Sequence, residues 1–254
     1  MNNRFIIVVP LYNAKKWLGK CLKSISLQTH TNFECIMIDD KSTDGSYEIA
    51  TSLVGNDDRF KIVRNEVNVG PLANVYNGAI NFSTDPQPED VVVIVDGDDM
   101  LAGKNSLKTL NEYYQDDSCW MTYGSYINLS NKSRGKFSNQ IPEFVINKNL
   151  FREYQWSSSH LRSYKVFLLQ SINASDLKNE NGNFFKTAGD LAMMFPLLEL
   201  SGHNARFVSE ILYVWNDLNT LNEHKVKRDS QLQSEKAIRR SKKYNKLVRN
   251  KNAN

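Results

Sequence analysis

The chain has 254 residues, of which 41% are hydrophobic and 24% charged, and its net charge is +4. This composition is ordinary for a globular protein with one large domain or two small ones. Three scattered cysteines (Cys21, Cys35 and Cys119) exclude a disulfide framework, and no apolar run approaches the 18 residues of a membrane span. Because the N-terminus also lacks a signal-peptide pattern, we expect a reducing, cytoplasmic compartment.

Strand and helix patterns alternate through the first half of the sequence. Apolar, β-branched runs predict strands, and apolar residues at helical spacing predict helices. In chain order we expect a strand at 5–9, a helix at 14–27, a strand at 33–38, a helix capped by 42–44 and running to about 53, a strand at 60–63, a helix opening after Gly70-Pro71, a strand at 91–95 and a helix around 107–114. Repeated βα units predict an α/β fold with a doubly wound, mostly parallel sheet and flanking helices.

The second half is less regular. A strand is expected at 119–123, a polar loop at 130–139, and a helix in the latter part of WSSSHLRSYKVFLLQSI (156–172). The segment TAGDLAMMFPLLELSG predicts a helix that is kinked at Pro196 and ended by Gly202. A strand at 206–215 follows.

The C-terminal segment differs in charge from the rest of the chain. Residues 225–254 hold eleven Lys/Arg and two Asp/Glu, a net charge of +9, which leaves −5 for the preceding 224 residues. We expect a main domain at 1–222 and a basic, helix-compatible tail at 223–254. The tail could lie against anionic lipid, as a peripheral membrane contact, or form a solvated end. Nucleic acid is disfavoured because the basic run lacks interleaved aromatic residues.

Polar residues follow each predicted strand of the first half. Ligands of open α/β sheets bind outside the carboxyl ends of the strands, so these residues should share one edge. They are Pro10, Tyr12 and Asn13 after the first strand, Asp39 and Asp40 after the second, Asn68 and Gly70 after the third, and Asp96, Asp98 and Asp99 in VVVIVDGDDM after the fourth. Crowded carboxylates repel one another unless a cation or hydrogen-bond donors offset them, which favours a divalent cation over a solvated acidic turn.

Two common phosphate-binding patterns are absent from the sequence. There is no G-x-G-x-x-G after the first strand and no G-x-x-x-x-G-K-[ST], so neither a dinucleotide fingerprint nor a P-loop is supported. Without a glycine cradle, the charge of bound phosphates must be neutralised by a metal held by Asp98 and a neighbouring carboxylate.

The stretch VVPLYNAKKWLGKCLKSISLQTHTNFECIMIDDKSTDGS, followed by VDGDD, resembles the opening of an inverting family 2 glycosyltransferase with the GT-A fold, and the resemblance extends from about Phe5 to Asn216. It implies that Asp40 faces the base of a sugar nucleotide and that Pro10 and Tyr12 line the nucleotide pocket, next to Asn13 and Asn68. A carboxylate accepts a hydrogen bond from uracil N3–H, whereas cytosine offers none there, which favours a UDP donor over a CDP donor but leaves GDP and dTDP open.

The same resemblance assigns the remaining roles. Asp96 and Asp98 would form the D-x-D pair near the ribose and an Mn²⁺ or Mg²⁺ ion, with Asp99 as an alternative ligand. Asp190 in AGDLAMM matches the catalytic base, although Gly189 stands where Glu is common; a helix-capping aspartate is the alternative. His224 is a candidate contact for the metal or diphosphate, His160 for the acceptor or phosphates, and Arg162 and Lys225 for the phosphates.

The sequence therefore predicts a metal-dependent inverting glycosyltransferase of the hexosyl or N-acetylhexosaminyl type. It would use a nucleotide-sugar donor and a hydroxyl acceptor on a glycan, a lipid-linked substrate or a protein. Two alternatives are a sugar-1-phosphate nucleotidyltransferase, disfavoured because PLYNAKKW lacks a Gly-rich loop, and a sugar-nucleotide-binding protein without catalytic activity. The sugar, the acceptor and the linkage depend on loop shapes that the sequence does not specify.

Overall fold

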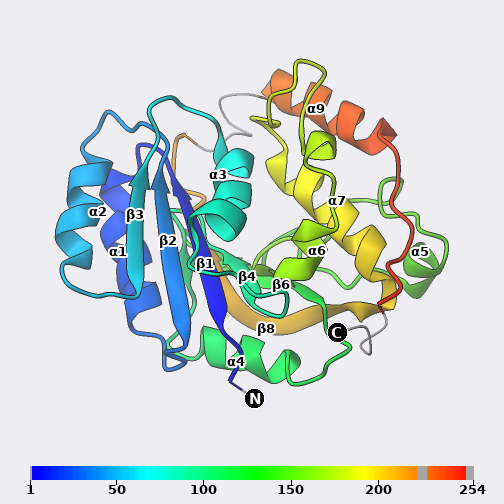
Figure 1. Ribbon diagram of the computed structural model, residues 1–254, viewed down its shortest axis with the longest axis horizontal. Coiled ribbons are helices and arrows are strands. Elements are labelled where there is room, and N and C mark those ends of the chain that lie inside the picture. The colour runs from blue at the N-terminus through cyan, green and yellow to red at the C-terminus, as the bar shows by residue number, and fades with distance from the viewer. Residues whose placement is uncertain (1, 222–227, 250–254) are drawn as a thin grey trace.

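The computed structural model describes residues 2–221 and 228–249, and these contain one eight-stranded sheet. Its strands lie in the order β3-β2-β1-β4-β7-β6-β8-β5, with helices packed on both faces (Figure 1). They are β1 (Phe5–Leu11), β2 (Phe33–Asp39), β3 (Phe60–Arg64), β4 (Val91–Ile94), β5 (Met100–Leu101), β6 (Met121–Asn128), β7 (Arg162–Lys165) and β8 (Ala205–Trp215). This arrangement confirms the predicted α/β fold class.

The first half of the sheet is parallel and lies between two apolar cores. β1 pairs with β2 and β4, and β2 pairs with β3, all in parallel. Ile6 and Val8 of β1 enter one core with residues of α3 and α7, whereas Ile7 and Val9 enter the other with residues of α1. Both faces of the strand are thus covered, which explains its continuous apolar run. The helical elements of this half are α1 (Lys15–Ser26), α2 (Ser46–Val54), α3 (Pro71–Asn77), the π-helical η1 (Gly78–Phe82) and α4 (Ser106–Tyr113).

The second half of the sheet is mixed. β7 is antiparallel to β4 and β6, while β8 is parallel to β6 and antiparallel to β5. The predicted helix in the latter part of 156–172 is confirmed as α6 (Val166–Gln170), but β7 just before it was not predicted. Its four residues, R-S-Y-K, are buried although three of them are polar, so no apolar run marks the strand. The short helices α5 (Glu143–Asn147), η2 (Ala174–Leu177) and η3 (Gly202–Asn204) complete this half.

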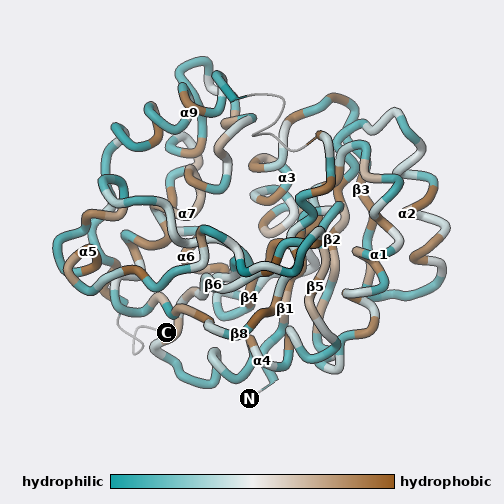
Figure 2. Tube along the Cα trace, turned by 180° about the vertical axis from the view of Figure 1, so that it is seen from behind, coloured by the Kyte–Doolittle hydropathy of each residue, from teal (hydrophilic) through white to brown (hydrophobic). Residues whose placement is uncertain are grey.

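Helix α7 (Gly189–Ser201) crosses one face of the sheet and is buried along almost its whole length. Pro196, where the sequence predicted a kink, lies inside this helix, and the helix ends at Gly202 as expected, with a φ of 51° that suits glycine. Figure 2 shows apolar residues concentrated in the central strands, whereas α9 carries polar residues along its outer side. No helix in the described part of the chain is long and apolar enough to cross a membrane.

The C-terminal segment lies against α7 rather than projecting into solvent (Figure 1). Helix α9 (Arg228–Arg240) buries Ile238, which is 3% exposed. Beyond it, the backbone N–H of Tyr244 donates to Glu199 Oε2 (2.9 Å) and that of Leu247 donates to the Leu200 carbonyl (2.9 Å). Residues 228–249 are therefore part of the packed structure.

Candidate functional site

A cavity of about 580 Å³ opens at the carboxyl ends of β1, β2 and β4, next to α3 and the start of α7. Its wall contains most of the predicted site residues: Pro10, Tyr12, Asp40, Asn68, Asp96, Asp98, Asp99, His160, Arg162 and Asp190. Asn13 is not in this wall; its Oδ1 instead accepts a hydrogen bond from the Thr43 N–H (2.9 Å). The candidates His224 and Lys225 lie outside the described residues.

Asp40 follows β2 and is held by the loop that precedes α3. Its Oδ1 accepts hydrogen bonds from Asn65 Nδ2 (2.8 Å) and the Val69 N–H (2.9 Å), and its Oδ2 accepts one from the Gly70 N–H (2.8 Å). Gly70 has a φ of 93°, which favours glycine at this turn. A carboxylate oxygen has two lone pairs, so Oδ2 keeps one acceptor position while the loop fixes the orientation of the group.

The turn after β4 carries the three clustered aspartates. The Asp99 N–H donates to the Asp96 carbonyl (2.8 Å), and the Gly97 N–H donates to the Pro10 carbonyl of β1 (3.0 Å). A Cβ at position 97 would lie 2.7 Å from Leu11 Cβ, so only glycine permits this approach. The neighbouring strand thus fixes the turn in the cavity wall.

Residues of β8 and the loop after it orient two of these carboxylates. Asp99 accepts hydrogen bonds from the Tyr213 hydroxyl and the Asn216 N–H, both at 2.7 Å, and Asp98 accepts one from Asn219 Nδ2 (2.6 Å). Burial raises the pKa of Asp99 well above its usual range, and the adjacent carboxylates raise it further. Burial also raises the pKa of Asp98, and the hydrogen bond from Asn219 opposes that rise.

The third carboxylate, Asp96, has a cation beside it. Its side chain is 33% exposed in the cavity wall, and its Oδ2 lies 3.4 Å from Nη2 of Arg162. Burial raises the pKa of Asp96 to about 6; Arg162 opposes this rise, and Asp98 adds to it. Arg162 belongs to β7, which pairs with β4 and so brings a guanidinium to the acidic turn. Part of the negative charge in the cavity is thereby offset.

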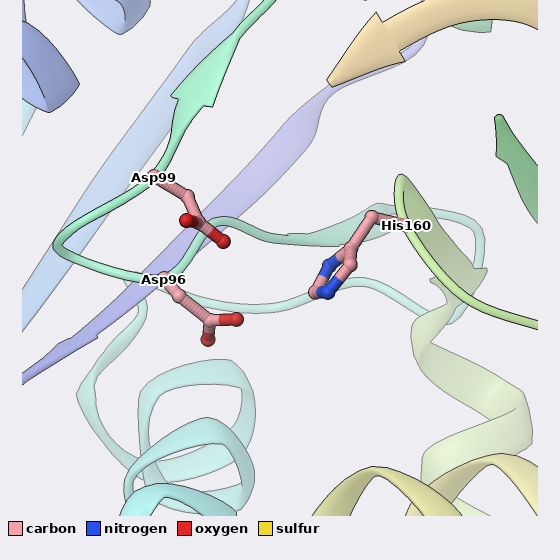
Figure 3. Close-up of side chains that lie close together, drawn as sticks. All are labelled: Asp96, Asp99 and His160. Atoms are coloured by element: carbon pink, nitrogen blue, oxygen red, sulfur yellow. The ribbon is translucent and has the colours of Figure 1, made fainter. Parts of the chain in front are cut away.

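Asp96, Asp99 and His160 form a group with the donors of a metal site: one ligand atom of each lies within 4.8 Å of the others (Figure 3). His160 stacks on the Tyr213 ring, with centroids 4.5 Å apart and an interplanar angle of 3°. Burial, and secondarily Arg162, holds the pKa of His160 well below its usual range, so the imidazole is neutral and can bind a metal. Two carboxylates and a neutral imidazole fit a divalent cation.

This group differs from the metal ligands expected from the sequence, which were Asp98, Asp96, Asp99 and His224. The structure brings His160, expected as a substrate contact, to Asp96 and Asp99, and it pairs Asp98 with Asn219.

Asp190 enters the same cavity from α7. The N-cap residue of the helix is Ala188, with a left-handed φ of 54°. Asp190 lies two residues further on, so it is not the helix-capping aspartate considered as the alternative to a catalytic base. A Cβ at Gly189, where Glu is common, would lie 3.0 Å from Leu72 Cβ on α3, so the helix start packs closely against α3. Burial raises the pKa of the Asp190 carboxyl, and Arg162 opposes that rise.

Several residues of the site were missed in the sequence. Tyr213, Asn216 and Asn219 orient the carboxylates, and the cavity wall also contains Asn74, Lys186 and, from α9, Gln231. None belongs to a motif of its own. Tyr213 and the two asparagines after it reach the site through the position of β8, and Gln231 reaches it through the packing of α9.

Comparisons with known proteins show the family of this chain. The sequence matches the family model described as glycosyl transferase family 2 over residues 6–173. Glycosyltransferase GlyG of Streptococcus pneumoniae is 34% identical over 137 residues, which cover 54% of this chain and 43% of GlyG. The GalNAc(5)-diNAcBac-PP-undecaprenol beta-1,3-glucosyltransferase of Campylobacter jejuni is 30% identical over 173 residues, which cover 65% of this chain and 52% of that protein. This chain thus spans about half the length of these relatives.

Solved structures share the fold at low sequence identity. Staphylococcus aureus TarS 1–349 in complex with UDP-GlcNAc aligns with a TM-score of 0.61 at 21% identity, covering 84% of this chain and 58% of TarS 1–349. Mannosyltransferase PcManGT from Pyrobaculum calidifontis, in complex with GDP-Man and Mn²⁺, aligns with a TM-score of 0.62 at 18% identity, covering 95% of this chain and 66% of PcManGT. This likeness confirms the GT-A fold. Because the family model spans more than half of the chain, the protein belongs to glycosyl transferase family 2.

Proposed function

We propose that this protein is a metal-dependent inverting glycosyltransferase that moves one sugar from a nucleotide diphosphate to a hydroxyl group. One observation carries the proposal: the acidic turn, His160, Arg162 and Asp190 line a single cavity at the carboxyl ends of the parallel strands. Family membership supports the class of reaction. The complexes of TarS with UDP-GlcNAc and of PcManGT with GDP-Man support a nucleotide-sugar donor.

The donor would bind with its base between the end of β1 and the loop before α3. Tyr12 is 49% exposed at the cavity, which leaves its ring free to cover a base, and Pro10 lies beside it in the wall. The free lone pair on Asp40 Oδ2 suits an imide N–H such as uracil N3–H. UDP is therefore the nucleotide we expect.

Mn²⁺ or Mg²⁺ would be held by Asp96, Asp99 and His160, with Asp98 next to them. When bound, such a cation acts as a Lewis acid on the negative charge of the departing nucleoside diphosphate. Arg162 adds a fixed positive charge on the same side of the cavity, 3.4 Å from Asp96, where it can attract a diphosphate oxygen.

Asp190 would act as the general base. An alcohol is far too weak an acid to ionise at neutral pH, so a carboxylate must take its proton as the oxygen attacks the anomeric carbon. The bond from that carbon to the diphosphate oxygen breaks as the new bond forms, and attack from the opposite face inverts the anomeric centre. The raised pKa of Asp190 makes it a stronger base than an exposed aspartate.

The acceptor would approach along the part of the cavity wall formed by Met193, Met194, Trp215, Leu221 and Gln231. This mixed wall suits a hydroxyl carried on a glycan, a lipid-linked sugar or a protein. A lipid-linked acceptor has support from the name of the Campylobacter jejuni relative. Three cations of the C-terminal segment, Arg239, Lys243 and Arg249, already pair with carboxylates of the protein, so the structure adds no support for the membrane contact considered for the tail.

A screen of nucleotide sugars tests the proposal before any acceptor is known. Thermal stability and slow hydrolysis of the sugar would be measured with each nucleotide sugar, in the presence of Mn²⁺ or of EDTA. We expect a UDP-sugar to raise the melting temperature and to be hydrolysed only with the metal. Stabilisation without hydrolysis would favour a binding protein, and release of pyrophosphate from UTP and a sugar 1-phosphate would favour a nucleotidyltransferase.

A further inference from the structure

We infer that Asn74 reads the base of the donor nucleotide and, with Asp40, selects bases that present an N–H beside a carbonyl oxygen. Uracil, thymine and guanine have this edge, whereas cytosine and adenine carry an amino group in place of the oxygen. The inference rests on the proposed nucleotide-sugar site and names the residue that sets its base specificity.

Asn74 and Asp40 are joined by a single amide. Asn65 Nδ2 donates to Asp40 Oδ1 (2.8 Å) and to Asn74 Oδ1 (2.8 Å). An ionised carboxylate can only accept, so the group of Asn65 that faces Asp40 must be its NH₂, and its second bond must reach an acceptor on Asn74. The orientation of the Asn74 amide follows from this chemistry: its oxygen is bound to Asn65 and its NH₂ points away from Asn65.

The NH₂ group of Asn74 has no partner within the described part of the chain. Its Nδ2 is buried without a hydrogen bond, although the residue, 1% exposed, belongs to the cavity wall. A buried donor without a partner is unfavourable, so a ligand oxygen at this point would recover the missing hydrogen bond. The neighbouring amide of Asn68 uses one of its two N–H groups on the Asp40 carbonyl (3.1 Å). Asn74 thus offers a ligand a buried amide that makes no hydrogen bond through its NH₂ to the described residues.

The two free groups form a pair of one hydrogen-bond acceptor and one donor. Asp40 Oδ2 offers an acceptor and Asn74 Nδ2 a donor, on side chains that Asn65 holds together. The N3–H and O4 of uracil match this pair, as do the N1–H and O6 of guanine. Cytosine would present its N3 lone pair to the carboxylate and its amino group to the amide, so both contacts would be mismatched. A site built this way rejects the wrong edge strongly because its buried polar groups stay unpaired.

The depth of the pair fits the direction of a bound nucleotide. Asp40 and Asn74 are 3% and 1% exposed, whereas Asp96 on the acidic turn has a side chain 33% exposed. The ribose is attached to N1 of uracil, on the side away from N3–H and O4. With the diphosphate near the acidic turn, the ribose side of the base faces that turn. The opposite edge of the base, which carries N3–H and O4, then reaches deepest between β2 and α3.

The test compares nucleotide binding by the wild-type protein, Asn74→Leu and a control, Asn77→Leu. The control removes the same group from the same helix, but Asn77 Oδ1 accepts from Asn81 Nδ2 (2.8 Å) and the residue is not in the cavity wall. Calorimetric titrations with UDP, CDP, GDP and ADP would all contain Mn²⁺. We expect Asn74→Leu to weaken UDP binding about 10- to 100-fold and CDP binding less than about threefold, while Asn77→Leu changes neither.

The outcomes separate this inference from the proposed function. If the wild type binds UDP or GDP but the preference over CDP or ADP is unchanged in Asn74→Leu, the role of Asn74 is overturned alone. This includes an equal loss of UDP and CDP affinity, because the residue would then not read the oxygen that cytosine lacks. If the wild type binds none of the four nucleotides, both proposals fail. Should Asn74→Leu not fold, Asn74→Ser, which shortens the side chain away from the base, serves the same comparison.

Discussion

Asp190 is the residue on which the proposed turnover depends most directly. Asp190→Asn keeps the shape of the side chain but removes the proton acceptor, so we expect kcat for transfer or donor hydrolysis to fall about 10²- to 10⁴-fold. The affinity for UDP with Mn²⁺, measured by calorimetry, should stay within about twofold. Asp58→Asn, at an exposed position outside the cavity wall, is the matched control. Turnover near the wild-type rate would show that another group is the base.

The pKa of Asp190 also predicts a pH dependence. The base works only when ionised, and burial raises its pKa, so activity should be lost as the pH falls through a value above the ordinary aspartate range. Arg162 opposes the rise in this pKa, and Arg162→Gln should therefore move the acid limb of kcat/KM to higher pH. A pH series of donor hydrolysis, run on the wild type and on Arg162→Gln, measures the acid limb of each protein. A limb that stays in place, or moves to lower pH, would contradict the role of Arg162.

The two assignments of the metal ligands make opposite predictions. His160→Phe keeps a ring that can stack on Tyr213 but removes the imidazole nitrogen, so the gain in thermal stability from Mn²⁺ should disappear. For the wild type, that gain is about 2.7 kcal/mol at a metal concentration 100 times the Kd. Asp98→Asn should keep most of it, because the Asp98 carboxylate pairs with Asn219. The reverse result would favour the ligand set expected from the sequence.

At the scale of elements, a buried ion pair joins α7 to the segment after α5, and both of its partners also hydrogen-bond to the C-terminal segment. The guanidinium of Arg152 and the carboxylate of Glu199 are 2% and 0% exposed, with Nη2 and Oε2 2.9 Å apart. Arg152 Nη1 also donates to the Ile238 carbonyl (2.7 Å) at the end of α9, and Glu199 accepts the Tyr244 N–H. Both charges thus have further partners, which offset the cost of burying them.

Breaking this pair should be costly. Arg152→Met leaves the Glu199 carboxylate buried without its cation, and we expect the free energy of unfolding to fall by about 3–5 kcal/mol. Urea denaturation at neutral pH measures the change. The control is Arg206→Met, which breaks a surface pair with Asp116 and should cost about 1 kcal/mol or less. Similar losses in the two variants would show that burial of the Arg152 pair contributes little.

The elements also show which parts of the fold can be predicted from sequence. Strands β1, β2 and β4 are covered on both faces and read as apolar runs, so they and the carboxylates at their ends were predictable. Strand β7 was not, because its residues are buried through polar contacts: the Ser163 hydroxyl lies 2.8 Å from that of Tyr114 and 2.6 Å from that of Thr122.

The site, too, could be predicted only where its residues follow an apolar strand. Asp96, Asp98 and Asp99 follow a strand and could be placed by it, but the grouping of His160 with Asp96 and Asp99 depends on the pairing of β7 with β4. The role of Tyr213 depends likewise on where β8 lies in the sheet. Such contacts between distant segments leave no periodic pattern in a single sequence.

At the scale of the whole molecule, the cavity lies between two parts of the chain that are bridged by polar contacts. Arg162 reaches Asp96, Asn219 reaches Asp98, and Lys186 Nζ donates to the Asn68 carbonyl (2.9 Å). Each bridge joins the first half, where the donor would bind, to the second half, which carries Asp190. The two parts must therefore keep a fixed relation for the donor and the base to face the same reacting carbon.

The C-terminal segment helps to maintain that relation. The Thr187 hydroxyl, three residues before Asp190, lies 2.8 Å from the Ser234 hydroxyl of α9, and Gln231 of the same helix lines the cavity. The packing of Ile238 anchors the helix on the core that contains α7. The segment that the sequence suggested as a tail thus contacts the loop just before the helix that carries the proposed base.

A shortened chain tests the expected division into a main domain at 1–222 and a tail at 223–254, by asking whether the main domain is stable alone. A chain ending at residue 221 loses the burial of Ile238 and two hydrogen bonds of Arg152, to the Ile238 carbonyl and the Ser241 hydroxyl. We expect its free energy of unfolding, from urea denaturation, to be about 3–6 kcal/mol lower than that of the full chain. A chain ending at residue 249 retains these contacts and is the control. The shorter chain could instead unfold at the same urea concentration as the control and hydrolyse the donor at the same rate. In that case the C-terminal segment contributes nothing to stability, and its contacts near Asp190 do not affect activity.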